Sequence, residues 1–268
     1  MGAHLYRSLL DPYGDMLRKF LKSRAAPARS AAAIPVGQRV YAIGDIHGRL
    51  DLLDTLLAAI DADDGAREDA TTSLIFLGDF VDRGADSAGV VERVRQLVDE
   101  RANVRWLIGN HEEIFLAAID GDQQALRLFC RVGGRETAIS YGIAAGDYEA
   151  MDYAELGDAL AAVVPAAHRT FLSSGEDIVI VGGYAFVHAG VHPDRALDQQ
   201  RTADLRWIRE RFLDHPRPLE KMIVHGHTIA DTVEFAPHRI GIDTGAYASG
   251  KLTALGLEGE QVWQVATG

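Results

Sequence analysis

The chain contains a single cysteine, Cys130, among its 268 residues. One cysteine can form neither an internal disulfide nor a multi-thiolate metal site, so the composition favours a reducing, cytoplasmic location. No run of about 18 apolar residues occurs, and the sequence therefore predicts no transmembrane segment. Positive charge is also scarce: 27 Lys and Arg face 39 Asp and Glu, giving a formal net charge of -12. That balance argues against broad nucleic-acid binding, which requires a basic surface.

The basic residues that do occur are frequent in residues 1–35, a segment that lacks the continuous apolar stretch of a signal peptide. We interpret residues 1–35 as a tail and linker, followed by a single domain over residues 36–268. Leu17, Phe20 and Leu21 are spaced as in a short basic amphipathic helix, which would suit a membrane surface or a partner. A mobile tail, or a helix that lies on the domain itself, is the alternative, and these interpretations stay open.

Three short apolar runs in the first half end in polar residues. Residues 40–43, 74–77 and 104–108 read as buried strands, and helical periodicity follows the first two. Short connections of this strand–helix–strand kind imply parallel pairing with right-handed crossovers. The residues that follow the three strands should therefore meet at one edge of the sheet, where open α/β folds bind ligands.

The second half has a different pattern. Residues 113–175 read as largely helical, and we predict that they border the substrate cleft. Short strands then alternate with glycine turns, a pattern that favours a meander over further strand–helix–strand units. The expected strands are residues 178–181, 185–187, 221–224, 232–235, 239–242, 252–257 and 262–265. The sequence thus predicts an α/β fold of two packed mixed sheets flanked by helices.

Five of the predicted strands end in residues that commonly bind metals. Each segment alone could be a turn, a helix cap or a buried histidine, but five in one domain are hard to explain in that way. Mixed carboxylate, amide and imidazole groups suit a pair of cations such as manganese, iron or zinc. The segments are Asp45-x-His47, Asp79 with Asp82-Arg83-Gly84, Asn110-His111-Glu112, His188-Ala-Gly190 and His225-Gly-His227.

Three of these motifs together resemble the signature of the calcineurin-like metallophosphoesterases. They are Gly-Asp-Ile-His-Gly (44–48), Gly-Asp-Phe-Val-Asp-Arg-Gly (78–84) and Gly-Asn-His-Glu (109–112). The closest similarity is to the phosphoprotein phosphatase branch, and within it to the bacterial and lambda-phage serine/threonine phosphatases. The resemblance extends over residues 39 to about 257, and it implies an αββα sandwich with two metals at the ends of the strands.

The resemblance also implies the ligands of two divalent cations, with Asp79 bridging them; manganese is the expected metal, and iron or zinc is possible in its place. The first cation would be held by Asp45, His47 and Asp79. The second would be held by Asp79, Asn110, His188 and His227. Carried over in the same way, a metal-bridged hydroxide attacks phosphorus in line, without a phosphoenzyme.

Four further residues receive roles from the resemblance. His111 would protonate the leaving oxygen, and Asp82 would hydrogen-bond its other nitrogen. Arg83 would bind phosphate oxygens in a bidentate manner. Arg209, in Trp-x-Arg, matches a second phosphate-binding arginine. Two sets of alternatives stay open: Arg206 and Arg211 compete with Arg209, and His225 competes with His227 as a ligand.

The implied activity is hydrolysis of phosphate monoesters, with a serine/threonine protein phosphatase as the leading hypothesis. The partner would then be a phosphorylated protein or a small phosphorylated molecule. Symmetrical dinucleoside-polyphosphate hydrolases share the same motifs and are the alternative enzyme class. A non-catalytic binding scaffold is a third hypothesis, but it would not need the proton donor His111. We place Asp243 and Thr244 behind the site as hydrogen-bonding supports.

Overall fold

Strand β1 (Gln38–Ile43) shows why the chain forms layers in the computed structural model, which describes residues 32–268. Successive side chains of a strand point to opposite faces. Tyr41 and Ile43 pack with buried residues of two helices, whereas Val40 and Ala42 pack against a second sheet. Both faces of β1 are therefore covered, as its apolar sequence requires. The amphipathic segment proposed around Leu17 lies outside the described residues.

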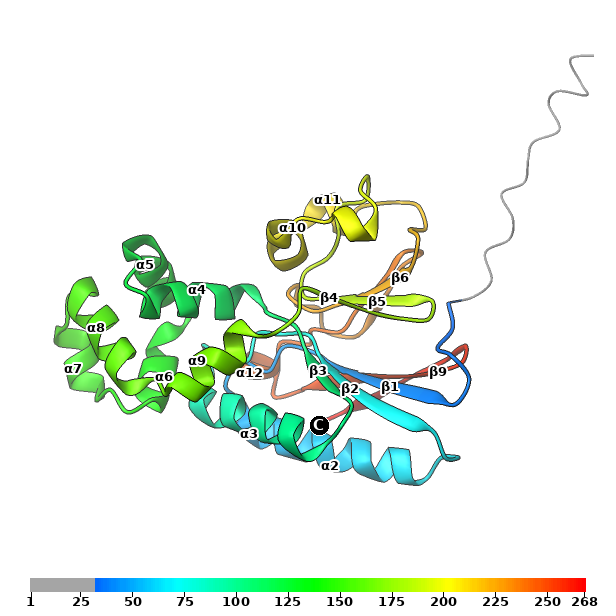
Figure 1. Cartoon of the computed structure of the whole chain (residues 1–268), viewed down its shortest axis with the longest axis horizontal. Coiled ribbons are helices and arrows are strands. Elements are labelled where there is room, and N and C mark those ends of the chain that lie inside the picture. The colour runs from blue at the N-terminus through cyan, green and yellow to red at the C-terminus, as the bar shows by residue number, and fades with distance from the viewer. Residues whose placement is uncertain (1–31) are drawn as a thin grey trace, which may run out of the picture. The chain divides into compact units, whose positions relative to one another are not determined.

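The first sheet has the strand order β10-β9-β1-β2-β3. Its central strands β1, β2 (Thr71–Phe76) and β3 (Val104–Trp106) pair in parallel, as predicted, and the β9–β10 hairpin adds antiparallel strands at one side. Helices α2 (Leu50–Gly65) and α3 (Ser87–Glu100) cover the outer face of this sheet (Figure 1). The last strands of the chain are β9 (Thr253–Glu258) and β10 (Gln261–Ala266).

The second sheet has the order β4-β5-β6-β8-β7 and packs on the first through apolar side chains from both. Its strands are β4 (Ile178–Val181), β5 (Tyr184–Val187), β6 (Met222–His225), β7 (Glu234–Phe235) and β8 (Arg239–Gly241). Leu205 and Phe212, from α10 (Thr202–Trp207) and α11 (Glu210–Leu213), pack with its outer face. The arrangement is helix, sheet, sheet, helix, and it confirms the predicted fold class.

The predicted meander is wrong for the middle of this sheet. Strand β5 pairs in parallel with β6, and β6 pairs in parallel with β8, so crossovers must connect them. The crossover from β5 to β6 runs through a 3-10 turn (Leu197–Gln199), α10 and α11. These helices are too short to show helical periodicity, so the sequence pattern gives no sign of the crossover. The hairpins β4–β5 and β9–β10 are antiparallel, as expected.

The segment between β3 and β4 is helical, as predicted, and Figure 1 shows its helices grouped to one side of the sheets. Gly133, with a φ of 111°, separates α5 from α6. The helices are α4 (Asn110–Ile119), α5 (Gln123–Val132), α6 (Gly134–Ser140), α7 (Ala145–Ala150), α8 (Tyr153–Val163) and α9 (Ala166–Ser173); α12 (Ala246–Ser249) follows β8. Among residues 32–268, no helix has the length and apolar character needed to cross a bilayer.

Candidate metal centre and active site

The loops after the strands contain an unusual backbone conformation. Among the described residues, five that are not glycine have a positive φ. This conformation costs about 1 kcal/mol or more at each position, and such strain clusters at functional sites. The five are His47 (48°), Asp79 (53°), Asp82 (73°), Arg83 (72°) and His227 (62°). All five are among the predicted site residues, so the strain and the candidate chemistry coincide.

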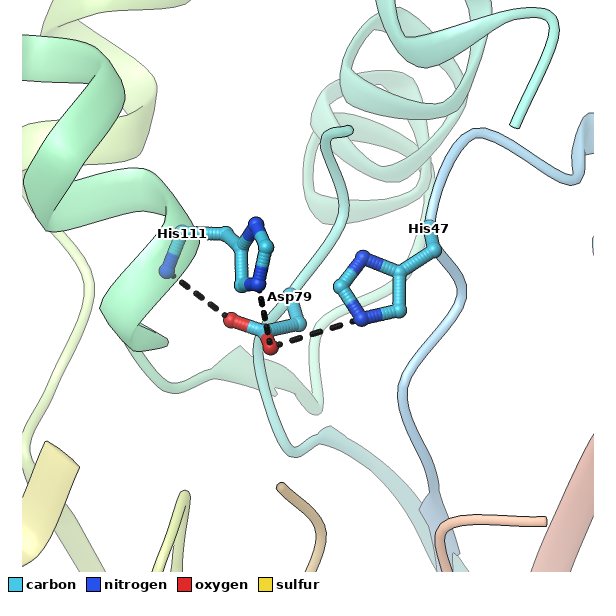
Figure 2. Close-up of side chains that lie close together, drawn as sticks. All are labelled: His47, Asp79 and His111. Carbon is cyan, nitrogen blue, oxygen red and sulfur yellow. Dashed lines mark hydrogen bonds and ion pairs between the residues drawn. The ribbon is translucent and has the colours of Figure 1, made fainter. Parts of the chain in front are cut away.

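Asp79 lies at the centre of two groups of metal-binding side chains. The first group is His47, Asp79 and His111, and the second is Asp79, His188 and His227 (Figure 2 shows the first). Asp79 Oδ2 lies 3.5 Å from His47 Nε2, and Asp79 Oδ1 lies 3.4 Å from His188 Nε2. One carboxylate therefore faces both groups, which is the geometry that a bridging ligand requires.

The tautomers of His47 and His188 follow from their backbone partners. His47 Nδ1 donates to the Val81 carbonyl and His188 Nδ1 donates to the Leu77 carbonyl, each at 2.8 Å. Burial lowers the pKa of His47 to about 3 and also lowers that of His188, so both rings are neutral near pH 7. His188 Nε2 therefore presents a lone pair toward Asp79. The lone pair of His47 Nε2 accepts an N–H of Arg83 at 3.0 Å.

Further polar side chains converge on His188 Nε2. His188 Nε2 lies 3.0 Å from Asn110 Oδ1 and 3.2 Å from His227 Nδ1, in addition to its contact with Asp79. The lone pairs of His188 Nε2 and Asp79 Oδ1 face each other at 3.4 Å, an arrangement that a cation between them would stabilise. Nitrogen and oxygen ligands of this kind fit a divalent metal.

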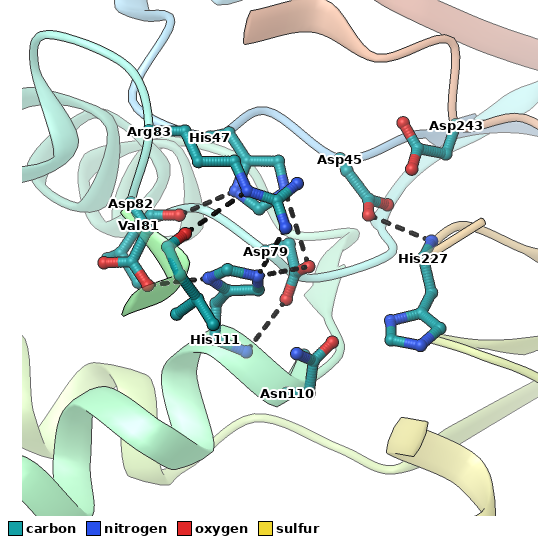
Figure 3. Close-up of polar contacts among 12 residues, drawn as sticks. Asp45, His47, Asp79, Val81, Asp82, Arg83, Asn110, His111, His227 and Asp243 are labelled. Atoms are coloured by element: carbon teal, nitrogen blue, oxygen red, sulfur yellow. Dashed lines mark hydrogen bonds and ion pairs between the residues drawn. The ribbon is translucent and has the colours of Figure 1, made fainter. Parts of the chain in front are cut away.

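Asp45 adds a buried carboxylate beside the second group. Its Oδ2 accepts a hydrogen bond from the His227 backbone N–H at 2.9 Å, while Asp45 Oδ1 and His227 Nε2 are buried without a partner among the described residues (Figure 3). Burial and the neighbouring Asp243 and Asp79 carboxylates raise the pKa of Asp45. Buried like charges and unpaired polar atoms are what a bound cation would satisfy.

The segments around Asp45 and His227 differ from the extended geometry that sequence spacing suggests. The chain turns at His47 and at His227, because both adopt left-handed backbone angles. Asp45 lies beside His227, whereas His47 lies nearer Asp79 and His111. His225 is directed elsewhere: it contacts Phe212, and Nδ1 bonds to the Gly226 carbonyl. The structure therefore brings His227, and not His225, to Asp79.

His111, a member of the first group, also forms a hydrogen-bonded set with Asp82 and Arg83. His111 Nδ1 lies 2.6 Å from Asp82 Oδ2, and His111 Nε2 lies 3.0 Å from an Arg83 nitrogen. Burial opposes charge on His111, but the Asp79 carboxylate and the hydrogen bond to Asp82 outweigh it and raise its pKa. The Tyr247 ring packs 4.7 Å from the Arg83 guanidinium carbon. A guanidinium nitrogen can only donate, so this contact requires an unprotonated His111 Nε2, and a charged His111 ring would have to separate from Arg83.

The three candidate arginines between β5 and β6 differ in their partners. Arg206 binds Asp177 and Glu113, and Arg211 pairs with Asp194. Arg209 is exposed, and its side chain makes no hydrogen bond or ion pair with any residue from 32 to 268. Burial and His188 lower the pKa of His227 to about 2, and the charge of Arg209 contributes to that shift. The charge of Arg209 thus acts on His227 of the second group, whereas Arg206 and Arg211 are engaged in ion pairs.

Two buried residues that support the site, Glu112 and Thr137, were not predicted as site residues from the sequence. Glu112 lies in the first turn of α4, and its Oε2 accepts the Gly109 N–H. It also accepts the backbone N–H groups of Asp79 and Phe80, and it thereby fixes the turn that presents Asp79. Its position in the motif Gly-Asn-His-Glu is the sequence feature that could have indicated this role. Thr137, which binds Asp82, had no signal beyond its position after Gly133-Gly134.

The predicted supports Asp243 and Thr244 lie behind the site. Asp243 accepts the Gly245 N–H at 2.9 Å, and burial raises its pKa to about 6. The Thr244 hydroxyl bonds to the Lys251 carbonyl and lies 2.9 Å from the Thr253 hydroxyl. The loop that contains Asp243 and Thr244 is therefore fixed by hydrogen bonds to residues 245–253.

A sequence model of calcineurin-like phosphoesterases matches residues 38–250. The chain belongs to the calcineurin-like phosphoesterase family. This phosphoesterase is 27% identical over 228 residues to serine/threonine-protein phosphatase 2 of Salmonella typhimurium, covering 81% of this chain and 91% of the relative. It is 28% identical over 232 residues to the asymmetrical bis(5'-nucleosyl)-tetraphosphatase PrpE of Bacillus mycoides, covering 80% and 88%.

Relatives named as symmetrical bis(5'-nucleosyl)-tetraphosphatases also match the phosphoesterase. Among solved structures, one named provisionally as a diadenosine tetraphosphatase superposes with a TM-score of 0.59 at 22% identity, covering 89% of this chain and 99% of that chain. Similarity at that identity supports the fold alone. The family is one of hydrolases with a dinuclear divalent metal site, and the histidine and aspartate groups around Asp79 could bind such metals.

Proposed function

We propose that this phosphoesterase is a metal-dependent serine/threonine protein phosphatase. The observation that carries the proposal is the buried pair His111–Asp82, with 2.6 Å between Nδ1 and Oδ2, in which His111 also lies within the first of the two groups around Asp79. A serine or threonine alkoxide is a poor leaving group, so its phosphate ester benefits most from a proton donor. The similarity to the Salmonella phosphatase supports the same substrate class.

Two cations would be held around Asp79, which we propose as their shared ligand. Asp45 and His47 would complete the first set, and the second would comprise Asn110, His188 and His227. The unpartnered Asp45 Oδ1 and His227 Nε2 are atoms that such binding would satisfy. Bound cations would supply positive charge that acidifies a water molecule and neutralises phosphate oxygens. The mixed nitrogen and oxygen donors fit manganese, iron or zinc, and manganese is the metal to test first.

The arginines would bind and orient the phosphate. Arg83 presents a planar guanidinium beside His111, and the Tyr247 ring restricts its position. Arg209, free of ion pairs within residues 32–268, would bind a second edge of the phosphate. Arginine suits this role because its donors match two phosphate oxygens at once.

The reaction consumes water and needs no covalent enzyme intermediate. Water adds to phosphorus, the bond from phosphorus to the serine or threonine oxygen breaks, and His111 Nε2 gives its proton to that oxygen. The products are inorganic phosphate and the free hydroxyl. Asp82 would hold the proton on His111 Nδ1 and favour the charged ring, consistent with the raised pKa of His111.

Hydrolysis of dinucleoside polyphosphates is the second candidate, because relatives named for that activity match the chain over most of its length. A phosphoanhydride releases a more acidic leaving group and depends less on a proton donor. Both proposed activities would use the same side chains of the site, so only a comparison of substrates can distinguish them.

The test compares kcat/KM on a serine-phosphorylated peptide and on diadenosine tetraphosphate, after chelation and re-addition of manganese. A strong peptide preference that manganese restores supports the protein phosphatase. A preference for the dinucleotide would contradict it and assign nucleotide hydrolysis. Turnover of neither substrate, with two metals bound, would instead favour a binding scaffold.

A further inference from the structure

Thr137 connects the helical segment to the side chains proposed for proton donation. It lies on α6, is fully buried, and is 55 residues from Asp82 in sequence. The Asp82 backbone N–H donates to Thr137 Oγ1 at 2.8 Å, and the Thr137 hydroxyl donates to Asp82 Oδ1 at 2.7 Å. One side chain thus binds both the backbone and the carboxylate of the same residue.

These two hydrogen bonds leave the other Asp82 oxygen for His111. Asp82 Oδ2 lies 2.6 Å from His111 Nδ1, as Figure 3 shows for the two side chains. Ser87 adds a third polar contact, since its Oγ lies 3.0 Å from Thr137 Oγ1 and 3.1 Å from the Asp82 nitrogen. Asp82 adopts a strained φ of 73°, so its orientation depends on contacts that hold it there.

The same turn of the helical segment also holds the next residue. The Gly133 carbonyl, at the junction of α5 and α6, accepts the Arg83 backbone N–H at 2.9 Å. A Cβ atom added to Gly133 would lie 2.8 Å from the Arg83 nitrogen, so the two segments are in close contact. The helices that border the site therefore contact the proton-donor pair directly, and Thr137 makes the contact to its carboxylate.

We propose that Thr137 is a positioning residue that acts through Asp82 to align His111 for proton donation. The inference rests on the proposed role of His111. Removal of the Thr137 hydroxyl would leave Asp82 Oδ1 buried without a donor, and the carboxylate would be free to turn away from His111. The effect should then depend on how much the leaving group needs a proton.

The experiment compares Thr137→Val and Thr137→Ser with the parent enzyme, each loaded with manganese. Two substrates are used: a phosphoserine peptide, whose leaving group needs protonation, and p-nitrophenyl phosphate, whose leaving group does not. We expect Thr137→Val to lower kcat on the peptide by on the order of 10-fold or more, with little change on p-nitrophenyl phosphate and in KM. Thr137→Ser, which keeps the hydroxyl, should restore kcat on the peptide.

His111→Asn is measured on the same two substrates, and it distinguishes failure of the proposed role of His111 from failure of the inference about Thr137. If His111→Asn affects both substrates equally, the proposed proton donor is wrong, and the inference about Thr137 falls with it. If His111→Asn is selective for the peptide but Thr137→Val is not, only the inference about Thr137 is wrong. Thr137→Ala is made in parallel in case the valine variant does not fold, and we expect the same substrate selectivity from it.

Discussion

Strand β1 has a polar cluster at each end, and the two clusters differ in whether their buried charges are paired. At its start, the buried Arg39 donates to Glu258 at 2.7 Å, to Asp64 at 2.6 Å and to the Glu68 carbonyl. Asp63 beside it accepts from the Tyr41 hydroxyl at 2.6 Å and from Trp263 at 2.8 Å. In this cluster, which we call the structural cluster, the buried charge is paired and hydrogen-bonded.

Beyond the end of β1, the site around Asp79 shows the opposite features. Carboxylates with raised pKa values face one another, polar atoms are buried without partners, and five residues adopt strained backbone angles. A stable fold can contain both clusters because the same two sheets support them. The comparison teaches that unsatisfied charge, rather than polarity alone, marks the functional end of the strand.

The largest effect should follow from changing the carboxylate that both metal groups share. We expect Asp79→Asn to abolish binding of both cations and to reduce phosphatase activity to background, because an amide cannot neutralise two metals. Metal content after dialysis and titration calorimetry with manganese would measure this. Asp63→Asn, at the structural cluster, is the matched control and should retain both metals. Retention of both ions by Asp79→Asn would refute its bridging role.

The next largest effect should leave the metals in place. We expect His111→Asn to lower kcat on a phosphoserine peptide by about 100-fold or more, the scale that general acid catalysis supplies. Metal content should not change, since His111 is proposed as a proton donor and not as a ligand. Steady-state kinetics with metal analysis on the same sample would test this. Unchanged turnover would remove His111 from the mechanism.

The contrast between the two ends also explains what the sequence could predict. Gly-Asp-x-His and the related motifs lie directly after apolar runs, so the strands and the edge at which their residues gather follow from local pattern. The left-handed turns at His47 and His227 do not, because spacing arguments assume an extended chain. The bond between Thr137 and Asp82, and that between Arg39 and Glu258 across 219 residues, depend on packing that no local pattern encodes.

At the structural cluster, loss of a carboxylate should affect stability and not catalysis. We expect Asp63→Asn to lower the free energy of unfolding by about 1–3 kcal/mol, because an amide is a weaker acceptor for Tyr41, Trp263 and Arg67. Urea unfolding at neutral pH measures the change, and kcat should stay at the parent value. Asp69→Asn, at an exposed residue with no side-chain hydrogen bond among residues 32–268, is the control. Equal stability of the two variants would contradict the role of Asp63.

In the metal-free protein, replacing a carboxylate of the site by an amide should not lower stability, in contrast to the same replacement at Asp63. Burial and the Asp243 and Asp79 carboxylates raise the pKa of Asp45, so its ionised form disfavours the folded state above that pKa. We therefore expect Asp45→Asn, at pH 8 in chelator, to match or slightly exceed the parent in Tm, since the amide oxygen can still accept the His227 N–H. Manganese should stabilise the parent more than the variant. A clear loss of Tm in chelator would show that Asp45 is structural.

The smallest effect concerns the pH at which the benefit of Asp63 disappears. The hydrogen bond from Arg67 is the main cause that lowers the pKa of Asp63 to about 2, although burial opposes it. An unperturbed aspartate titrates near about 3.9. An acid with a depressed folded pKa contributes stability above its unfolded pKa, and that contribution is lost as the pH falls through the folded value.

The difference in unfolding free energy between the parent and Asp63→Asn should therefore be constant above about pH 5 and narrow between about pH 4 and pH 2. Because both proteins share every other titrating group, the subtraction cancels the buried histidines of the site, which also titrate in acid. Urea unfolding of the chelated proteins at several pH values would provide the curve. A difference that grows as the pH falls would mean that Asp63 is not ionised in the folded protein, and the structural cluster would then contain an uncompensated arginine.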